Sequence, residues 1–145
     1  MQQLTMYTDG GSRGNPGPSA IGVVFFKDGQ KIKGFSQYLG EKTNNEAEYE
    51  ALIFGFKKAK ALLGKGVLKS TALEVRSDSE LLVRQMNGQY KIQEPHIQQL
   101  FLEVWNLKTD FGEVKIIAIP RELNKEADKL VNEALDAQNQ HKTLF

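Results

Sequence analysis

Four acidic residues stand where an α/β protein commonly presents its chemistry. Asp9 and Asp78 each follow an apolar, strand-like segment, whereas Glu48 and Asp128 lie near the starts of two helical patterns. Side chains at the carboxyl ends of parallel strands emerge at one edge of a sheet. We therefore expect the four carboxylates to gather there, although each acid alone is more typical of a helix cap or a solvated turn.

A cluster of four carboxylates points to metal chemistry. Like charges raise one another's pKa, so such a cluster persists only where cations neutralise it. The chain has no cysteine and only two histidines, and oxygen ligands alone favour Mg²⁺ or Mn²⁺. Two such ions about 4 Å apart can hold a phosphodiester, because one activates a water and the other stabilises the leaving oxygen.

An irregular loop follows the first acid. The segment TDGGSRGNPGPSA, residues 8–20, holds four glycines and two prolines. Residues without a Cβ allow a bulky polymer to approach the backbone, which favours substrate contacts at Gly10 and Gly11. Asn15 before Pro16 is also ordinary turn chemistry, and spacing alone leaves both interpretations open.

Periodicity predicts the elements that position these residues. Asp28-Gly29 separates two apolar segments and is a strong type I′ hairpin signal. Thr43 or Asn44 caps a long helix. The expected elements are strands at 4–10, 21–26 and 32–38, a helix at 43–64, a strand at 71–78, helices at 79–88 and 95–110, a strand at 114–119 and a helix from 124.

This order predicts the α/β fold class, with a five-stranded mixed sheet of three antiparallel strands and then parallel ones, flanked by helices. Residues 1–140 are expected to form a single domain and residues 141–145 a short flexible tail. On the helix at 95–110, apolar residues recur at i, i+3, i+4, i+7 and i+8, which places Trp105 in the core.

Composition excludes several classes of protein. The 145 residues are 40% hydrophobic and 26% charged, and no apolar run approaches the roughly 20 residues of a membrane helix. No secretory signal is expected from MQQLTMYTDGG, and the lack of cysteine fits a reducing compartment, so we predict a cytoplasmic location. A net charge of +1 leaves any polyanion to local patches such as the lysine-rich segment 57–69.

Four segments become recognisable together: YTDGGSRGNPGPSAIGVV, TNNEAEYEAL, RSDSELLVRQMNG and PRELNKEADKL. In this order they closely resemble type 1 ribonucleases H, the enzymes that hydrolyse RNA paired with DNA. The resemblance covers about residues 4–137. Within the family, the chain looks like the shorter subgroup that lacks a basic protrusion. It implies a ribonuclease H-like fold and an endonuclease that cuts the RNA strand of RNA–DNA hybrids, leaving 5′-phosphate and 3′-hydroxyl ends.

The resemblance also implies a catalytic set. The family's three aspartates and one glutamate fall on Asp9, Glu48, Asp78 and Asp128, and its pattern T-N-N-x-x-E selects Glu48 over Glu46. These residues are implied to bind two Mg²⁺ ions, for which Mn²⁺ can substitute. In the family's arrangement Asp9 bridges both ions, Glu48 and Asp78 bind one of them, Glu48 also lies near the 2′-hydroxyl, and Asp128 holds the second ion loosely.

Substrate-reading residues are implied in the same way. A protein separates RNA from DNA at the 2′-hydroxyl, and the family uses its glycine loop and T-N-N motif in the minor groove. Thr43 looks placed for a phosphate of the DNA strand, which is compatible with capping because a helix N-terminus binds anions. The implied substrate-binding residues are Gly10, Gly11, Arg13, Asn15, Thr43, Asn44, Asn45 and Asn124; for Arg13, a solvated loop position is the open alternative.

The sequence departs from many relatives in its basic residues. The link NGQYKIQEPH between two helices has no room for a basic protrusion. We therefore expect weaker, strongly salt-dependent hybrid binding, since each lost phosphate contact removes counterion release. The remaining basic candidates are Lys57, Lys58, Lys60 and Arg84.

A second departure lies in the loop IPRELNKE, which lacks the histidine that many members carry. Either Arg121, Glu122 or Lys125 takes its role, or the role is dispensable. Glu80 also stands where many relatives have a neutral amide, which puts one minor-groove contact in doubt.

Two other functions compete with hybrid cleavage. The first is a different nuclease on this scaffold, such as a junction resolvase or an exonuclease. The set Asn15, Asn44 and Asn45 argues against it. The second is a hybrid-binding module without catalysis, which the complete acid set disfavours. The protein is expected to be a monomer and to have no membrane among its partners.

Overall fold

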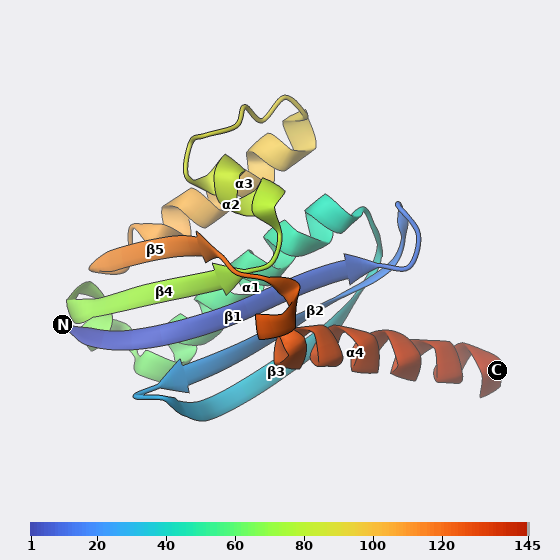
Figure 1. Cartoon of the computed structure of the whole chain (residues 1–145), viewed down its shortest axis with the longest axis horizontal. Helices are drawn as coiled ribbons and strands as arrows, with labels where there is room; N and C mark the ends of the chain where they lie inside the picture. The colour runs from blue at the N-terminus through green and yellow to red at the C-terminus, as the bar shows by residue number, and fades with distance from the viewer. Residues whose placement is uncertain (145) are drawn as a thin grey trace.

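The chain folds around one five-stranded sheet in the order β3-β2-β1-β4-β5 (Figure 1). The structure is a computed structural model that describes residues 1–144, with side chains for residues 1–140. Its strands are β1 (Gln2–Ser12), β2 (Gly17–Lys27), β3 (Gln30–Lys42), β4 (Thr71–Ser77) and β5 (Glu113–Ala118). The helices are α1 (Asn44–Leu63), α2 (Glu80–Met86), α3 (Pro95–Lys108) and α4 (Lys125–Leu144), with short 3₁₀ turns η1 (Lys65–Ser70) and η2 (Arg121–Leu123).

The sheet is mixed, as predicted. The strands β1, β2 and β3 pair antiparallel, whereas β4 runs parallel to both β1 and β5. The predicted hairpin turn is confirmed, because Asp28 and Gly29 both have positive φ, 53° and 77°. In β1 the structure corrects the sequence: the strand does not end at Asp9 but continues along β2 to Ser12.

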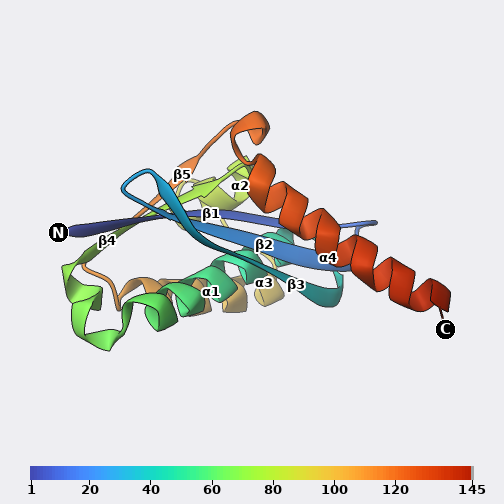
Figure 2. The same ribbon diagram turned by 90° about the horizontal axis from the view of Figure 1, so that it is seen from below.

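Helices cover the two faces of the sheet unequally. In Figure 2, α1 and α3 lie on one face and α4 on the other. The main core lies under α1 and includes Met6, Phe25, Tyr49 and Phe56. A smaller cluster under α4 consists of Ala20, Val131 and Leu135, with Tyr38 and Ala134 packed against it.

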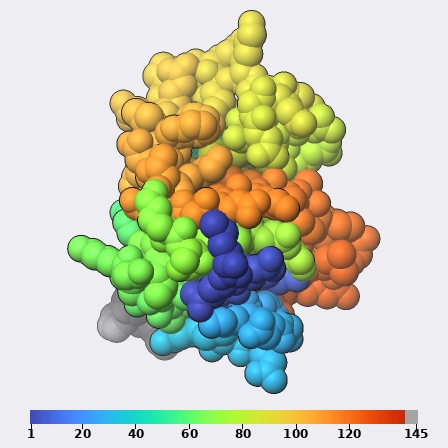
Figure 3. Space-filling model, turned by 90° about the vertical axis from the view of Figure 1, so that its left-hand side faces the viewer, coloured from blue at the N-terminus to red at the C-terminus, as the bar shows by residue number. Residues whose placement is uncertain are grey.

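The N-terminus lies at the opposite end of the sheet from the acidic residues. Figure 3 shows it in dark blue between the β2–β3 hairpin in light blue and the green segment that follows α1. Gln2 holds it there, because its side chain accepts a hydrogen bond from Lys27 at 2.9 Å and donates one to Thr71 at 3.3 Å. The carboxyl ends of β1 and β4 lie at the other end of the sheet, beside Asp9 and Asp78.

Trp105 is not a core residue, which corrects the sequence prediction. Its side chain is 48% exposed and stacks on Phe101, with the ring centroids 6.0 Å apart. Because α3 packs mainly against α1, it buries only the narrow stripe Ile97, Leu100 and Val104. The apolar face read from the sequence is wider than the face that a single neighbouring helix can cover.

The last helix is longer than expected. Its backbone is helical to Leu144, past the predicted domain end at residue 140, whereas Phe145 lies outside the described residues. None of the helices in the part of the chain that the structure describes is both long and apolar enough to cross a membrane.

Two glycines allow helices to approach the sheet closely near Asp9. A Cβ on Gly10 would lie 2.2 Å from the Ala47 carbonyl oxygen of α1, and a Cβ on Gly22 would lie 2.3 Å from the Ala127 carbonyl oxygen of α4. Gly22 pairs with Asp9 itself across the sheet. Both helices that carry acids therefore reach the sheet through positions where only glycine fits.

We predict that Gly22→Ala destabilises the protein by about 2 kcal/mol or more, because the added methyl group must push the α4 backbone off the sheet. The matched control is Gly66→Ala, where no atom lies within 4 Å of the added Cβ. The measurement is chemical denaturation of both variants. Equal free energies of unfolding for the two variants would contradict the close packing of α4.

Candidate active site

The parallel register of β1 and β4 brings the two strand-end acids together. The last residue pair of that ladder is Thr8 with Ser77, so Asp9 and Asp78 are the next residue on each strand. Glu48 reaches them from α1, and the three side chains offer carboxylate oxygens that all lie within 4.8 Å of one another. The structure thus brings together three of the four predicted acids as one tight group.

Glu48 is held in place by the strand that carries Asp9. Its Oε1 accepts a hydrogen bond from the Gly10 backbone N–H at 2.8 Å. Glu46 has a different task, since it forms a capping box with Thr43 and contacts His96 at 2.6 Å. Of the two glutamates, Glu48 is therefore the one in the acidic group.

Burial and mutual repulsion make this group electrostatically strained. Burial, together with the carboxylates of Asp78 and Asp128, raises the pKa of Asp9 to about 8. Burial first, and then Asp9 and Asp78, raises the pKa of Glu48 well above its usual value. The Gly10 N–H opposes both shifts. At neutral pH the group favours bound protons or bound cations.

Asp128 approaches the group from the other face of the sheet. It lies in the first turn of α4 and is exposed, and its carboxylate helps to raise the pKa of Asp9. All four acids line one cavity of about 450 Å³. Asp128 thus stands at the rim, beside the tight group rather than in it.

The donor set fits hard divalent cations. Three carboxylates converge on one point, two of them only 8% exposed, and no softer ligand belongs to the group. The raised pKa of Asp9 and Glu48 means that a cation relieves repulsion that the protein otherwise relieves by protonation. Asp9, Glu48 and Asp78 are the residues that would hold such an ion, with Asp128 at its open side.

Asn124 supports the site from behind. Its side chain is 1% exposed and donates hydrogen bonds to the Thr8 carbonyl at 2.9 Å and to Asp78 Oδ2 at 3.3 Å. This position contrasts with the predicted direct contact to substrate, because the amide lies behind Asp78 and not on the surface. Its role in the structure is to orient Asp78.

Asn15 and Asn44 tie the glycine loop to the start of α1. Asn15 Oδ1 accepts from the Asn44 N–H, and Asn44 Oδ1 accepts from the Ser12 N–H, each at 3.0 Å. Both side-chain oxygens are thus engaged, and among the described residues neither Nδ2 group donates to the protein. Asn45 points elsewhere: it lines a separate groove of about 530 Å³ with Tyr90 and Ile97.

The two glycines after Asp9 differ in their surroundings. Gly10 is buried, its N–H is taken by Glu48, and the space beside it is filled by α1, so the structure gives it a packing role instead of an open backbone surface. Gly11 lines the cavity and faces Val131. Arg13 also lines the cavity and is paired with Asp136 at 2.7 Å, so it is neither free nor a purely solvated loop residue.

Most of the predicted basic residues are already engaged within the protein. Lys57 pairs with Glu103 and Lys60 with Asp110, on the part of α1 far from its start. Arg84 differs. It pairs with Glu80 at 2.7 Å, but it also lines a groove of about 530 Å³ that reaches Asp78 and is distinct from the groove at Asn45. The remaining candidate has cation–π contacts: Lys58 lies over the rings of Phe35 and Phe54.

Arg121 is the cation nearest the acidic group in the loop before α4. It lines both the central cavity and the groove that carries Arg84, and its charge partly offsets the raised pKa of Glu48. Glu122 and Lys125 lie instead around a separate pocket beside Leu123. Of the three candidates for the role of the loop histidine, Arg121 is the one that lines the cavity.

Sequence reasoning missed the wall that α4 gives to the cavity. Val131, Asn132 and Leu135 line it together with Arg13. The signal that could have found Asn132 is its spacing of four residues from both Asp128 and Asp136, which places the three on one stripe of the helix.

Comparisons with known proteins agree with this geometry. A family model described as reverse transcriptase-like matches residues 7–134. The chain is 38% identical over 131 residues to ribonuclease HI of Halobacterium salinarum. The alignment covers 90% of this chain and 63% of that protein. It is 38% identical over 140 residues to a bifunctional protein of Mycobacterium tuberculosis and spans 37% of its length. The chain therefore spans less than two thirds of each relative's own length.

Solved structures extend the likeness to three dimensions. LC11-RNase H1, isolated from compost and solved in complex with an RNA/DNA hybrid, is 45% identical, with 93% of this chain and 98% of that chain covered and a TM-score of 0.88. The N-terminal RNase H domain of the mycobacterial protein is 34% identical, with 98% and 99% covered and a TM-score of 0.87. The chain belongs to the type 1 ribonuclease H family.

Proposed function

We propose that this protein is an endonuclease that hydrolyses the RNA strand of RNA–DNA hybrids by a two-metal-ion mechanism and leaves 5′-phosphate and 3′-hydroxyl ends. The observation that carries the proposal is the group formed by Asp9, Glu48 and Asp78, all within 4.8 Å of one another in an open cavity. The likeness to LC11-RNase H1, which was solved with an RNA/DNA hybrid, supports the substrate.

The acids have distinct roles in this proposal. Mg²⁺, or Mn²⁺ in its place, would be held by these carboxylates and would supply Lewis-acid activation of water and of the leaving oxygen. Asp9 belongs to the tight group and also interacts with the Asp128 carboxylate, so it is the residue able to serve both sides of the cavity. Glu48 and Asp78 complete one side, and Asp128 serves the more exposed one.

Residues of the glycine loop and α1 are proposed to read the substrate. The Nδ2 groups of Asn15 and Asn44 can donate to acceptors in a minor groove, because their oxygens already hold the loop against α1. The Thr43 hydroxyl accepts from the Glu46 N–H at 3.1 Å, which leaves its own hydrogen for a phosphate oxygen. The oxygen of Asn45 is buried without a protein partner and lies at the neighbouring groove.

Arg121 and Arg84 are proposed to supply local positive charge for the duplex. They line the same groove, which begins at Asp78 and runs past β5. With a net charge of only +1 and no basic protrusion, binding depends on a few such contacts and weakens steeply with salt. The monomeric state and the cytoplasmic location stay predictions.

We predict that Asp9→Asn binds a hybrid duplex but no longer cuts it. The amide keeps the size of the carboxylate but removes the charge that both sides of the cavity share, so the rate should fall by at least about 10³-fold. The measurement is cleavage of one end-labelled strand in each of four substrates: a hybrid, a duplex RNA, a duplex DNA and a four-way junction. Each substrate is tested with Mg²⁺, Mn²⁺ or a chelator.

The folded wild-type protein should cut only the hybrid, internally and only with a metal. The matched control is Asp28→Asn, in the β2–β3 turn, which should cut like the wild type. An intact hybrid in the presence of both metals would refute hybrid cleavage, and preferential junction cleavage would favour the resolvase alternative.

We also predict an unusual pH dependence of stability without metal. The pKa of Asp9 is about 8 in the folded protein and about 3.9 in an unfolded chain, so the folded state binds the proton more tightly. The corresponding stabilisation is complete below about pH 4 and is lost as the pH rises through about 8. Thermal unfolding with a chelator should therefore show Tm falling across this range.

Asp9→Asn removes the ionising group, so at pH 8 it should raise Tm by roughly 5 °C or more over the metal-free wild type. Excess Mg²⁺ should raise Tm of the wild type at pH 8 and have much less effect on the variant. Asp28→Asn again serves as the control. Parallel pH profiles for the wild type and Asp9→Asn would contradict the strained acidic group.

A further inference from the structure

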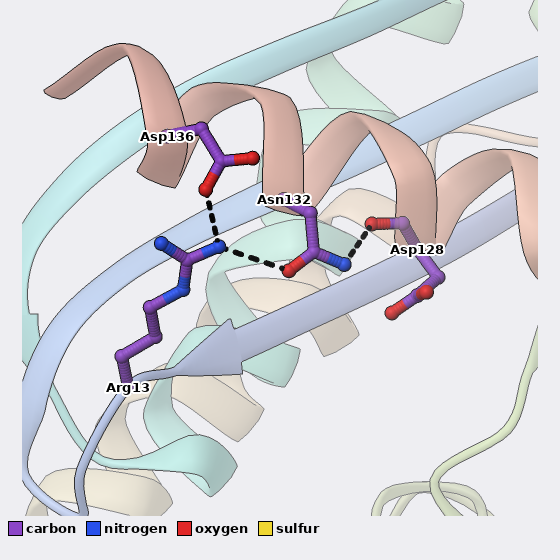
Figure 4. A network of polar contacts seen from close by, with 4 residues as sticks. All are labelled: Arg13, Asp128, Asn132 and Asp136. Carbon is purple, nitrogen blue, oxygen red and sulfur yellow. Dashed lines mark hydrogen bonds and ion pairs between the residues drawn. The ribbon is translucent and has the colours of Figure 1, made fainter. Parts of the chain in front are cut away.

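A polar bridge joins the β1–β2 loop to α4 beside Asp128. Arg13 donates from Nη2 to Asp136 Oδ1 at 2.7 Å and to Asn132 Oδ1 at 3.3 Å, and Asn132 donates from Nδ2 to the Asp128 backbone carbonyl at 3.1 Å (Figure 4). The contacts form a continuous chain from the loop after Asp9 to the peptide group of the fourth acid.

Two members of the bridge line the cavity that holds the acidic group. Asp128, Asn132 and Asp136 follow one another at intervals of four residues, which places them on one stripe of α4. Arg13 and Asn132 line the same cavity as Asp9 and Asp128. The stripe therefore faces the strand and loop that carry the other half of the site.

The position of Asp128 depends on the orientation of α4 more strongly than the positions of the other three acids depend on their own elements. It is exposed and stands outside the tight group that Gly10 helps to hold. The apolar contacts of α4 fix its distance from the sheet, but such contacts are not directional and restrain rotation of the helix poorly.

Polar contacts restrain α4 from two sides. On the β3 side, Ser36 donates to the Leu130 carbonyl at 2.7 Å, and Lys31 pairs with Glu126 at 3.0 Å. On the cavity side, Arg13 provides the restraint. Opposed restraints of this kind set the rotation of the helix and with it the position of Asp128.

The loop that carries Arg13 is itself anchored to α1. The Arg13 N–H donates to the Pro18 carbonyl at 2.8 Å, and Asn15 accepts from the Asn44 N–H at 3.0 Å. The bridge therefore connects α1, which carries Glu48, with α4 on the opposite face of the sheet, which carries Asp128.

We propose that Arg13, together with Asn132 and Asp136, is a positioning element that holds Asp128 against Asp9 so that the acids on the two faces act as one site. This inference rests on the proposed function of the acidic group. A different role for Arg13, direct binding of a substrate phosphate in competition with Asp136, makes the opposite prediction for one variant.

The decisive comparison is between Arg13→Ala and Asp136→Ala. Positioning predicts that both lower kcat on a hybrid by about threefold to tenfold, change KM less than about twofold, and raise the Mg²⁺ concentration needed for half-maximal activity. Arg13→Lys, which keeps the charge, should restore part of the loss. Direct phosphate binding predicts instead that Arg13→Ala raises KM and that Asp136→Ala, by freeing Arg13, lowers it.

Two measurements without substrate test the bridge independently of cleavage. Arg13→Ala should increase amide hydrogen exchange in the first turn of α4 and reduce the rise in Tm caused by Mg²⁺. In an Asp128→Asn background, Arg13→Ala should cause no further reduction of that rise, because Arg13 acts through Asp128. Glu133→Ala, which removes an outward-facing pair with Lys129 on the same helix, is the matched control and should match the wild type.

The inference is overturned if Asp136→Ala lowers KM with kcat unchanged, or if Arg13→Ala affects neither exchange in α4 nor the Mg²⁺-dependent rise in Tm. It is also overturned if Arg13→Ala reduces that rise equally with and without the Asp128 carboxylate. A wild-type protein that fails to cut hybrids refutes the proposed function, whereas the exchange and Tm measurements still decide whether the bridge positions Asp128.

Discussion

Three carboxylates within 4.8 Å of one another repel, and the fold has to hold them together against that repulsion. Asp9 and Asp78 cannot move apart, because the parallel ladder between β1 and β4 ends only one residue before them. Glu48 cannot withdraw, because α1 lies directly on Gly10 and the Gly10 N–H binds its carboxylate. The cost appears as the raised pKa of Asp9 and Glu48, which is the signature expected of a site built for cations.

The sheet separates rigid and adjustable parts of the site. The tight group rests on the central strand β1, on its neighbour β4, and on the helix that covers the main core. Asp128 comes from α4, which packs over a smaller apolar cluster and relies on polar contacts at its flanks. A site of this kind keeps one side of its cavity fixed while the other responds to the position of a single helix.

Much of this arrangement could be predicted from local sequence. The order of elements, the Asp28-Gly29 turn and the Thr43 cap follow mainly from local residue preferences, which depend little on distant neighbours. Position beside strand ends or helix starts drew attention to the acids, but the set of four was implied by the family resemblance. What failed depends on neighbours: Trp105 is exposed because α3 packs mainly against α1, and β1 runs past Asp9 because β2 continues to pair with it.

The roles of individual polar residues were harder to predict for the same reason. Asn124 and Gly10 are indistinguishable from substrate contacts until the fold places one behind Asp78 and the other under α1. The bridge from Arg13 to Asp136 joins residues more than a hundred positions apart in the chain, and no local pattern links them. The family resemblance implied the set of site residues, whereas the three-dimensional contacts show which of them lie behind other side chains and which line the cavity.

The most direct test of the account is calorimetric titration of Mg²⁺ into the metal-free protein at neutral pH, in two buffers with different ionisation enthalpies. If cations replace protons on the strained acids, Mg²⁺ binding must release protons, and the observed heat will depend on the buffer. Asp9→Asn should bind more weakly and release fewer protons. Mg²⁺ binding with no proton release, or no Mg²⁺ binding at all, would contradict the claim that repulsion among these carboxylates creates the metal site.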